Sequence, residues 1–431
     1  MKIAWVTPIN LRSAIGRAGV ETAQALAARG HEVEIWASEF DYDPAEPRHS
    51  TSLPMRPIGE VDLDHSGFDL AVVNFGDNFL FHAGGLEVLE RIPTVGIFHD
   101  VFIHNLFVGW LWGTDQPPHG HLANVEQIYG RAAGALSAPA LAGQLSLEEI
   151  AAKIPMTEWV ARRCQGAVAH ADFYRPRLEA SCPGPVDTAR LPWRGRAVAS
   201  LGKRRRERVV ALTVGVMNPN KCCDAVIEAI GRSPVLKDRL DYVLAGPIED
   251  GERARLQGLA DGLGVRLTML GPVSDAELEQ RLEAADILIC LRRPVLEGAS
   301  ASAIEGMLSG RPTVVADAGF YAELPDALVV KVDPAIDPAA LAAALEPLVL
   351  DEPARRRMGA AASAWATETF TQDRYIAVLE PLIEATAAAL PRMRTAGQLG
   401  RLFARMDLGP DDPGAVRALA LLDQLCPSGA A

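Results

Sequence analysis

The sequence predicts an α/β protein built from two tandem Rossmann-like βαβ domains that face a central cleft, with a mostly helical C-terminal tail. Short apolar runs, typical of buried parallel strands, alternate with helix-like segments along most of the chain. The alternation breaks in a stretch rich in proline and arginine and then restarts. The chain has 431 residues, which is too long for one ordinary core and favours two or three domains.

The first predicted domain spans residues 1–185. Its strand-like runs are 2–6, 31–37, 69–76, 93–100 and 166–171. A helix is predicted over 19–30, because Val20, Ala23 and Leu26 share one face and Gly30 follows as a terminator. Strands separated by helices imply βαβ units and therefore a parallel sheet.

A connection is predicted over 186–207, where prolines accompany the basic run GKRRRER. The basic run is interpreted as a solvated linker, with binding of an anionic surface as the alternative. The second domain, 208–370, repeats the pattern. Its strands are predicted at 208–215, 241–246, 265–271, 286–291, 312–317 and 327–332. Residues 371–431 are predicted to be helical, and the first helix is expected to cross back to the N-terminal domain.

Composition excludes several classes of protein. The net charge of −13 argues against a general nucleic-acid binder, which needs basic surface to neutralise phosphates. The six cysteines form no CxxC pair and no zinc spacing, so reduced thiols and a cytoplasmic protein are expected. The N-terminus lacks the features of a signal peptide, and no apolar run reaches the roughly 18 residues of a membrane span. Peripheral contact with a membrane is left open, and the tail could serve a homodimer.

The first strand–helix junction of the second domain reads GVMNPNKC. Gly215 ends the strand, and Lys221 begins the next helix, where a lysine can reach a phosphate that faces the helix N–H groups. Asn218 and Asn220 lie in the same loop and are further candidates. The loop is no Walker A motif, and the alternative is an ordinary surface lysine.

A later junction in the same domain reads EGASASAIEG, residues 297–306. A capping box with Ser302 as N-cap and Glu305 as its partner would explain Glu305 without any ligand. It would not explain Glu297. Gly298, Ala299 and Ser300 are small, so a ligand could approach their backbone closely and bind their N–H groups.

The first domain offers two junctions of its own. Residues 13–19 are predicted to link strand and helix, but they lack the GxGxxG fingerprint of a dinucleotide site. His99 and Asp100 end the strand 93–100, a place suited to proton transfer or hydroxyl binding. The alternative is a structural histidine. His119 and His121 have no third ligand nearby in the sequence, and no metal site is predicted.

These motifs resemble the retaining, nucleotide-sugar-dependent glycosyltransferases of family 4, which have the GT-B fold. The resemblance rests on ARGHEV (28–33), Gly-x5-Lys (Gly215 to Lys221), Glu-x7-Glu (Glu297 to Glu305) and SGRPTVVAD (309–317). It covers about residues 1–390 and is most specific in the second half. It implies transfer of a sugar, of the hexosyl type, from a nucleoside diphosphate sugar to an acceptor hydroxyl.

The resemblance also implies roles for individual residues. Lys221, next to Gly215, would bind the donor diphosphate, and Glu305 would bind the ribose hydroxyls. Glu297, with the N–H groups of Gly298, Ala299 and Ser300, would hold the sugar hydroxyls. Gly16 would let the first loop approach the donor phosphate and the acceptor, and His99 would lie by the donor sugar near the reacting carbon. No metal and no cofactor are implied, and the acceptor is a glycan, a lipid-linked molecule or a small molecule.

The sequence departs from the family at one phosphate-binding position. Val216 stands where the family usually has arginine, and Arg292 and Arg293 are candidates to replace that cation. Two alternatives to a transferase stay open. A nucleotide-sugar 2-epimerase would share the fold and convert the donor alone. A non-catalytic sugar-nucleotide-binding subunit would bind the donor without turnover.

Overall fold

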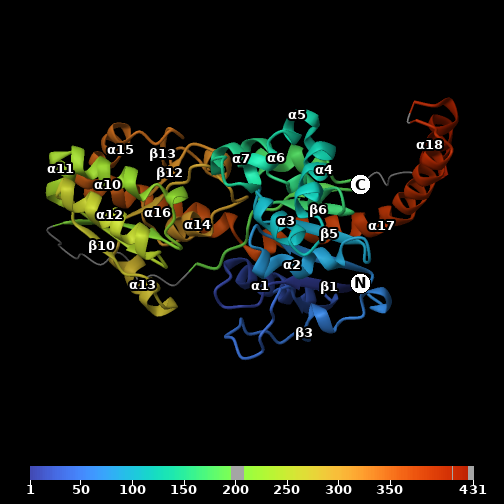
Figure 1. Cartoon of the computed structure of the whole chain (residues 1–431). Helices are drawn as coiled ribbons and strands as arrows, with labels where there is room; N and C mark the ends of the chain where they lie inside the picture. Colours follow the sequence, from blue (N-terminus) through green and yellow to red (C-terminus); the bar gives the residue numbers. More distant parts are fainter. Residues whose placement is uncertain (196–207, 410, 426–431) are drawn as a thin grey trace. The chain divides into compact units, whose positions relative to one another are not determined.

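A computed structural model describes residues 1–195, 208–409 and 411–425 of the chain. Of the connection predicted at 186–207, residues 196–207 therefore lie outside the described residues. By its internal contacts the chain forms two units, whose helices and strands are labelled in Figure 1. Unit 1 comprises Met1–Ala189 with Gln372–Ala431, and unit 2 comprises Arg190–Thr371.

Unit 1 is organised around a seven-stranded sheet with the order β3-β2-β1-β4-β5-β6-β7. All neighbouring strands are parallel, and Ile3 of β1, for example, pairs with Val33 of β2 and Leu70 of β4. The strands are β1 (Lys2–Thr7), β2 (Glu32–Ala37), β3 (Met55–Pro57), β4 (Leu70–Phe75), β5 (Thr94–Phe98), β6 (Gly166–Ala169) and β7 (Val186–Thr188).

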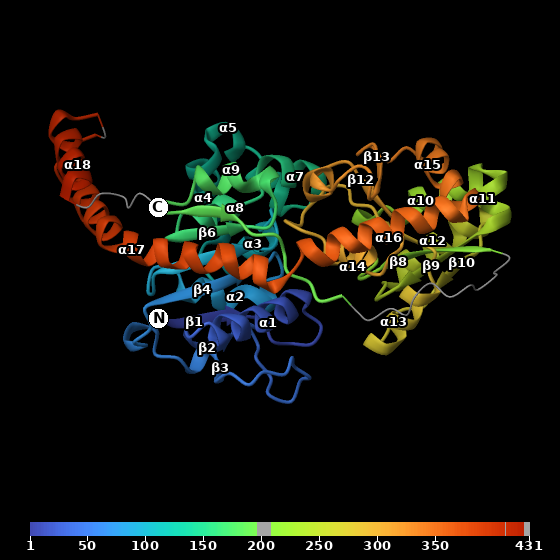
Figure 2. The ribbon, with the colours of Figure 1, turned by 180° about the vertical axis from the view of Figure 1, so that it is seen from behind.

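The helices of unit 1 come from both ends of the chain. They are α1 (Ala14–Ala28), α2 (Phe79–Val88), α3 (His104–Leu111), α4 (Pro117–Tyr129), α5 (Arg131–Gly134), α6 (Ser137–Leu141), α7 (Leu147–Lys153), α8 (Thr157–Ala161), α9 (Arg175–Glu179), α17 (Gln372–Arg405) and α18 (Pro413–Leu425). Figure 2 shows α17 lying across the sheet of this unit. Tyr375, Leu379 and Ile383 of α17 are buried in the same core as strands β1, β2 and β4. Helix α17 is therefore part of the core of unit 1.

Helix α1 begins five residues earlier than the predicted start at Gly19. Ser13 is its N-cap, and the Ser13 hydroxyl accepts a hydrogen bond from the Gly16 amide at 3.0 Å. Residues 13–19, predicted to be a link, are thus mostly helix. Their glycines have a packing reason, because a Cβ at Gly16 would lie 2.4 Å from the Pro8 carbonyl oxygen and one at Gly19 2.3 Å from Thr7 Oγ1. Helix α1 therefore packs directly on the end of β1.

Unit 2 repeats the parallel α/β arrangement with a six-stranded sheet of order β10-β9-β8-β11-β12-β13. Its strands are β8 (Val209–Val214), β9 (Leu240–Ala245), β10 (Leu267–Met269), β11 (Ile287–Cys290), β12 (Thr313–Ala316) and β13 (Val330–Val332). Its helices are α10 (Cys223–Arg232), α11 (Pro234–Arg239), α12 (Asp250–Leu263), α13 (Asp275–Ala284), α14 (Ala301–Leu308), α15 (Pro338–Leu350) and α16 (Glu352–Thr369). Two parallel sheets with helices between their strands confirm the predicted fold class.

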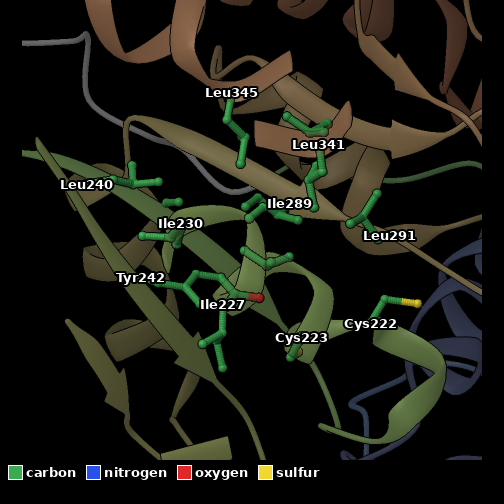
Figure 3. Close-up of a cluster of buried hydrophobic side chains, with 14 of the residues drawn as sticks. Cys222, Cys223, Ile227, Ile230, Leu240, Tyr242, Ile289, Leu291, Leu341 and Leu345 are labelled. Carbon is green, nitrogen blue, oxygen red and sulfur yellow. The ribbon is translucent and has the colours of Figure 1, made fainter. Parts of the chain in front are cut away.

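The core of unit 2 joins helices to one face of this sheet, as Figure 3 shows. Ile227 and Ile230 of α10 pack with Tyr242 of β9 and Ile289 of β11, and all four are at most 1% exposed. Burial of each such side chain stabilises the folded state by roughly 1.5–3 kcal/mol. The sheet order reverses between β8 and β11, so the loops after these two strands lie side by side at the carboxyl edge. That edge is the usual ligand site of an open parallel sheet.

Gly359, in α16, provides a test of how tightly unit 2 is packed. A Cβ at this position would lie 2.0 Å from the Gly310 carbonyl oxygen, so Gly359→Ala forces α16 away from the turn before β12. We expect the variant to lose about 1–3 kcal/mol of unfolding free energy in urea denaturation. Gly258, in α12, is the control, because nothing lies within 4 Å of a Cβ there. Gly258→Ala should be neutral or stabilising by up to about 1 kcal/mol, and equal losses in both variants would contradict the proposed packing.

Candidate active site

The loop after β8 carries a buried lysine. Lys221 ends the short 3-10 helix η4 (Pro219–Lys221), and only 6% of the residue is exposed. Its Nζ donates a hydrogen bond to the Val214 carbonyl oxygen at 2.7 Å, so the side chain folds back under its own loop. Burial, followed by the charge of Arg292, lowers the pKa of Lys221 from 10.5 to about 7. Lys221 is therefore not the ordinary surface lysine of the alternative interpretation.

Two glycines make room for this lysine. Gly215 has a φ of +100°, and a Cβ there would lie 3.1 Å from Lys221 Nζ. Gly246, at the end of β9, has a φ of +147°, and its Cβ would lie 2.1 Å from the Gly215 carbonyl oxygen. Residues with a side chain rarely adopt such backbone angles. Gly215 is thus required by both its conformation and its lysine neighbour.

The loop after β11 brings a second cation to the same edge of the sheet. Arg292 Nε lies 3.0 Å from Glu297 Oε1, with side-chain exposures of 11% and 18%. The Tyr321 hydroxyl, in η5 (Gly319–Glu323) after β12, donates to the same Glu297 oxygen at 2.6 Å. Glu297 therefore has two protein partners, although the sequence offered no structural reason for it. Sequence reasoning also missed Tyr321, which follows an apolar strand and is fully buried.

Arg293 and the two asparagines have structural contacts of their own. Arg293 Nη1 donates to the Ala335 carbonyl oxygen at 2.5 Å, and its backbone N–H donates to the Asn220 carbonyl oxygen at 3.0 Å. The Asn220 side chain donates to the Pro294 carbonyl oxygen. Asn218 is exposed, and its carbonyl oxygen accepts the Lys221 N–H at 3.0 Å. Of the two arginines, Arg292 is thus the one that acts electrostatically on Lys221.

The start of α14 differs from the predicted capping box. The N-cap is Ser300, whose hydroxyl accepts a hydrogen bond from the Ala303 amide at 3.3 Å, and Ser302 lies inside the helix. The prediction of Ser302 as N-cap was wrong because the helix begins at Ala301 and two serines compete for that position. Gly298, Ala299 and Ser300 are all buried.

Glu305 is buried in α14, with 7% of the residue exposed. Trp193 Nε1 donates a hydrogen bond to Glu305 Oε2 at 2.6 Å. Sequence reasoning missed Trp193 because the residue lies in the predicted connection, 112 positions away along the chain. The apolar residues Leu191 and Trp193, within an otherwise basic and proline-rich stretch, were the available indication.

The candidates in unit 1 lie at the carboxyl edge of the other sheet. His99 follows β5 and is 7% exposed, and both of its ring nitrogens have protein partners, Asn74 and His170. Asp100 Oδ2 accepts the Asp77 N–H at 2.8 Å, which ties together the turns after β4 and β5. Gly16 lies within α1 against the Pro8 carbonyl. Asn74 and His170 were not predicted as site residues, although each is a polar residue in or next to an apolar strand.

The described residues contain no group of three or more His, Cys, Asp or Glu side chains that could hold a metal ion. None of the described helices is both long and apolar enough to cross a membrane.

Comparison with known proteins gives a family match for the region that carries this lysine. Residues 200–365 match the family described as Glycosyl transferases group 1. The match covers most of unit 2 and none of residues 1–199. A search of curated protein sequences gives no match.

Solved structures of similar fold cover both units. Sucrose-phosphate synthase from Thermosynechococcus elongatus has a TM-score of 0.61 and 17% identity over 90% of this chain and 100% of its own. HepE of Anabaena, in complex with UDP-glucose, has a TM-score of 0.60 and 16% identity over 89% and 100%. WaaG, a glycosyltransferase involved in lipopolysaccharide biosynthesis, has a TM-score of 0.53 and 14% identity over 88% and 98%. At these identities the likeness establishes the fold, GT-B, and nothing finer.

The buried charge of Lys221 predicts a stability effect of pH in the absence of ligand. The pKa is about 7 in the folded chain and 10.5 ordinarily, so between these values the unfolded chain binds more protons and stability rises with pH. Below pH 7 the full cost of the buried charge is present. We expect Lys221→Met to be more stable than wild type at pH 6.5, on the order of a few kcal/mol, because one pKa unit corresponds to about 1.4 kcal/mol.

This margin should shrink steadily between pH 7 and pH 10, as measured by urea denaturation at a series of pH values. Lys237→Met is the matched control in the same unit, because Lys237 is exposed and should give a small, pH-independent change. A Lys221→Met variant with the same margin at every pH would show that the lysine is not buried as a charge.

Proposed function

We propose that the protein is a metal-independent glycosyltransferase of the hexosyltransferase type, which moves a sugar from a nucleoside diphosphate sugar to an acceptor hydroxyl with retention of configuration. The observation that carries this proposal is the pair of buried cations, Lys221 and Arg292, at the carboxyl edge of β8 and β11. Glu297 is the one carboxylate that the described residues show acting on Lys221, and it is already ion-paired with Arg292. When Lys221 is protonated, the edge therefore carries an excess positive charge, and an anionic ligand would neutralise that charge and favour the protonated form.

A diphosphate fits this charge and this position. Lys221 precedes α10, whose N-cap, Cys222, makes no side-chain hydrogen bond to the first turn, although Asp224 accepts the Ala225 N–H at 2.9 Å. N–H groups at a helix start together with a lysine form a common phosphate site. The family match over residues 200–365 and the UDP-glucose complex of the similarly folded HepE support a nucleoside diphosphate sugar as the donor.

The other residues are assigned by their places around this edge. Arg292 supplies the second cation that Val216, which is 59% exposed, does not provide. Glu305 binds the ribose hydroxyls. Glu297 holds Arg292 in place and, with the N–H groups after it, binds hydroxyls of the donor sugar. In the reaction, Lys221 and Arg292 stabilise the charge that develops on the departing diphosphate, and this stabilisation lowers the barrier to transfer. His99 is assigned to the transfer step.

The donor site is tested by measuring melting temperatures with UDP-glucose, UDP-N-acetylglucosamine, GDP-mannose, ADP-glucose and dTDP-glucose. A donor that binds only the folded chain raises the melting temperature by mass action. We expect at least one of the five to do so, and we expect Lys221→Met to weaken its binding by about 30-fold or more, because a charge-assisted contact to phosphate is lost. Lys237→Met should bind as wild type.

Failure of all five donors to bind, or unchanged binding by Lys221→Met, would overturn the donor-site assignment. Product analysis after long incubation with the bound donor separates the remaining classes. Release of nucleoside diphosphate and free or transferred sugar supports a transferase, and the anomeric configuration of the transferred sugar tests retention. Conversion of the donor alone to its 2-epimer would identify an epimerase, and binding without any turnover would identify a non-catalytic subunit.

A further inference from the structure

A chain of buried polar groups runs beneath the carboxyl edge of the sheet in unit 1. Asn74 of β4, His99 after β5 and His170 after β6 are 2%, 7% and 0% exposed. Asn74 Nδ2 donates to the Val6 carbonyl oxygen at 3.1 Å, and Asn74 Oδ1 lies 2.9 Å from His99 Nε2. His99 Nδ1 lies 3.1 Å from His170 Nε2, and His170 Nδ1 lies 3.0 Å from the Ala189 carbonyl oxygen. The chain thus joins β1, β4, β5 and β6 to the residue after β7.

The two ends of this chain fix most of its protons. The Val6 and Ala189 carbonyl oxygens can only accept hydrogen bonds. Asn74 must therefore present its NH2 group to Val6 and its carbonyl oxygen to His99, so His99 carries a proton on Nε2. From the other end, His170 must carry a proton on Nδ1.

The remaining contact, between His99 Nδ1 and His170 Nε2, needs a proton that two neutral rings do not supply. With both rings neutral, two lone pairs would face each other at 3.1 Å. One additional proton turns this contact into a hydrogen bond shared by the two rings. Burial opposes that charge, since it lowers the pKa of His99 well below its usual value and that of His170 to about 4. The hydrogen-bond geometry therefore favours an additional proton between His99 and His170, whereas burial of the resulting positive charge disfavours it.

The surroundings of the pair are aromatic and hydrogen-bonded. The His82 Nδ1 atom donates to the Asn74 carbonyl oxygen at 2.9 Å, and the Tyr174 hydroxyl donates to the Phe98 carbonyl oxygen at 2.7 Å. Tyr375 of α17 has its ring 5.8 Å from that of His170. Asp100, the acid next to His99 in the chain, accepts the Asp77 N–H. Tyr375 thus flanks the His170 ring, and the other contacts order the backbone around the pair.

We propose that His170 is a positioning residue for His99: its Nε2 shares one proton with His99 Nδ1 and, together with Asn74, it fixes the ring plane of His99. His170 has no place in the donor site assigned above and acts only through His99. Its effect on turnover rests on the proposed function, whereas the shared proton does not.

The shared proton is tested on the wild-type protein without any ligand. With 15N-labelled histidine, we expect a scalar coupling across the hydrogen bond between His99 Nδ1 and His170 Nε2, with the resonances assigned from single-histidine variants. Absence of this coupling would overturn the shared proton. In His170→Phe, which keeps a ring but has no nitrogen, His99 Nδ1 should move to the resonance of an unprotonated ring nitrogen. In His170→Gln, whose amide can still donate, it should move less.

The positioning role is tested by turnover of the nucleotide sugar from the panel above that binds best. We expect His170→Phe to lower kcat by about 10–100-fold with KM changed less than about threefold, because a misplaced ring affects the transfer step more than donor binding. His170→Gln should retain at least about a third of wild-type kcat.

A second pair of buried histidines in unit 1 provides a matched control for the loss of a buried histidine. His121 is also fully buried in unit 1 and pairs with His104, Nε2 to Nε2, at 3.1 Å. His121→Phe should change kcat less than about threefold. Equal losses in His170→Phe and His121→Phe, or no loss in either, would overturn the positioning role. If no donor turns over, the proposed function fails, and the NMR coupling still decides whether the proton is shared.

Discussion

The buried charge of Lys221 is the constraint on which the rest of unit 2's carboxyl edge depends. The Lys221 amine is held under its own loop by the Val214 carbonyl oxygen, next to the cation Arg292. Such a group is costly to bury, and its lowered pKa expresses that cost. A Cβ at Gly215 would lie 3.1 Å from Lys221 Nζ, and a Cβ at Gly246 would lie 2.1 Å from the Gly215 carbonyl oxygen, so both glycines keep room around the lysine loop. The proposed donor site therefore trades stability of the free protein for affinity towards an anion.

The same constraint changes the meaning of the two glutamates. Before the structure, Glu305 had a structural explanation and Glu297 had none. In the structure Glu297 is bound by Arg292 and Tyr321, whereas Glu305 accepts a hydrogen bond from Trp193 and does not form the predicted capping box. Glu297 is therefore first a counter-ion that keeps Arg292 next to Lys221. Arg292 and Tyr321 both contact Glu297 Oε1, so the proposed contact with a sugar hydroxyl would use Oε2.

Periodicity was enough to predict the two parallel sheets, because buried parallel strands are apolar over their whole length and stand out from helices. Periodicity did not predict the elements whose position depends on close packing or that are only partly buried. Residues 13–19 looked like a loop because of their glycines, yet those glycines let α1 pack on β1. The short edge strands β3 and β7 are only partly buried, and their apolar pattern is correspondingly weak.

Sequence alone could predict only the site residues that belong to local motifs. Lys221 and Glu297 lie in strand–helix junctions and Glu305 lies in the helix that follows one, so sequence alone could place them near the carboxyl edge. Their partners could not be found in this way. Tyr321 is 24 residues from Glu297 and Trp193 is 112 residues from Glu305, and only the folded sheet brings them together.

The two units treat buried polar groups at their carboxyl edges differently. Unit 2 keeps ionisable groups there, Lys221, Arg292 and Glu297, and the proposed donor diphosphate would balance their charge. Unit 1 keeps groups that can be neutral, Asn74, His99 and His170, and links them into a chain that ends on two carbonyls. With the proposed shared proton, His99 is bonded on both sides, and rotating its ring would break its contacts with Asn74 and with His170 at once. His99 is consequently held as a rigid group, which is what a residue assigned to a transfer step requires.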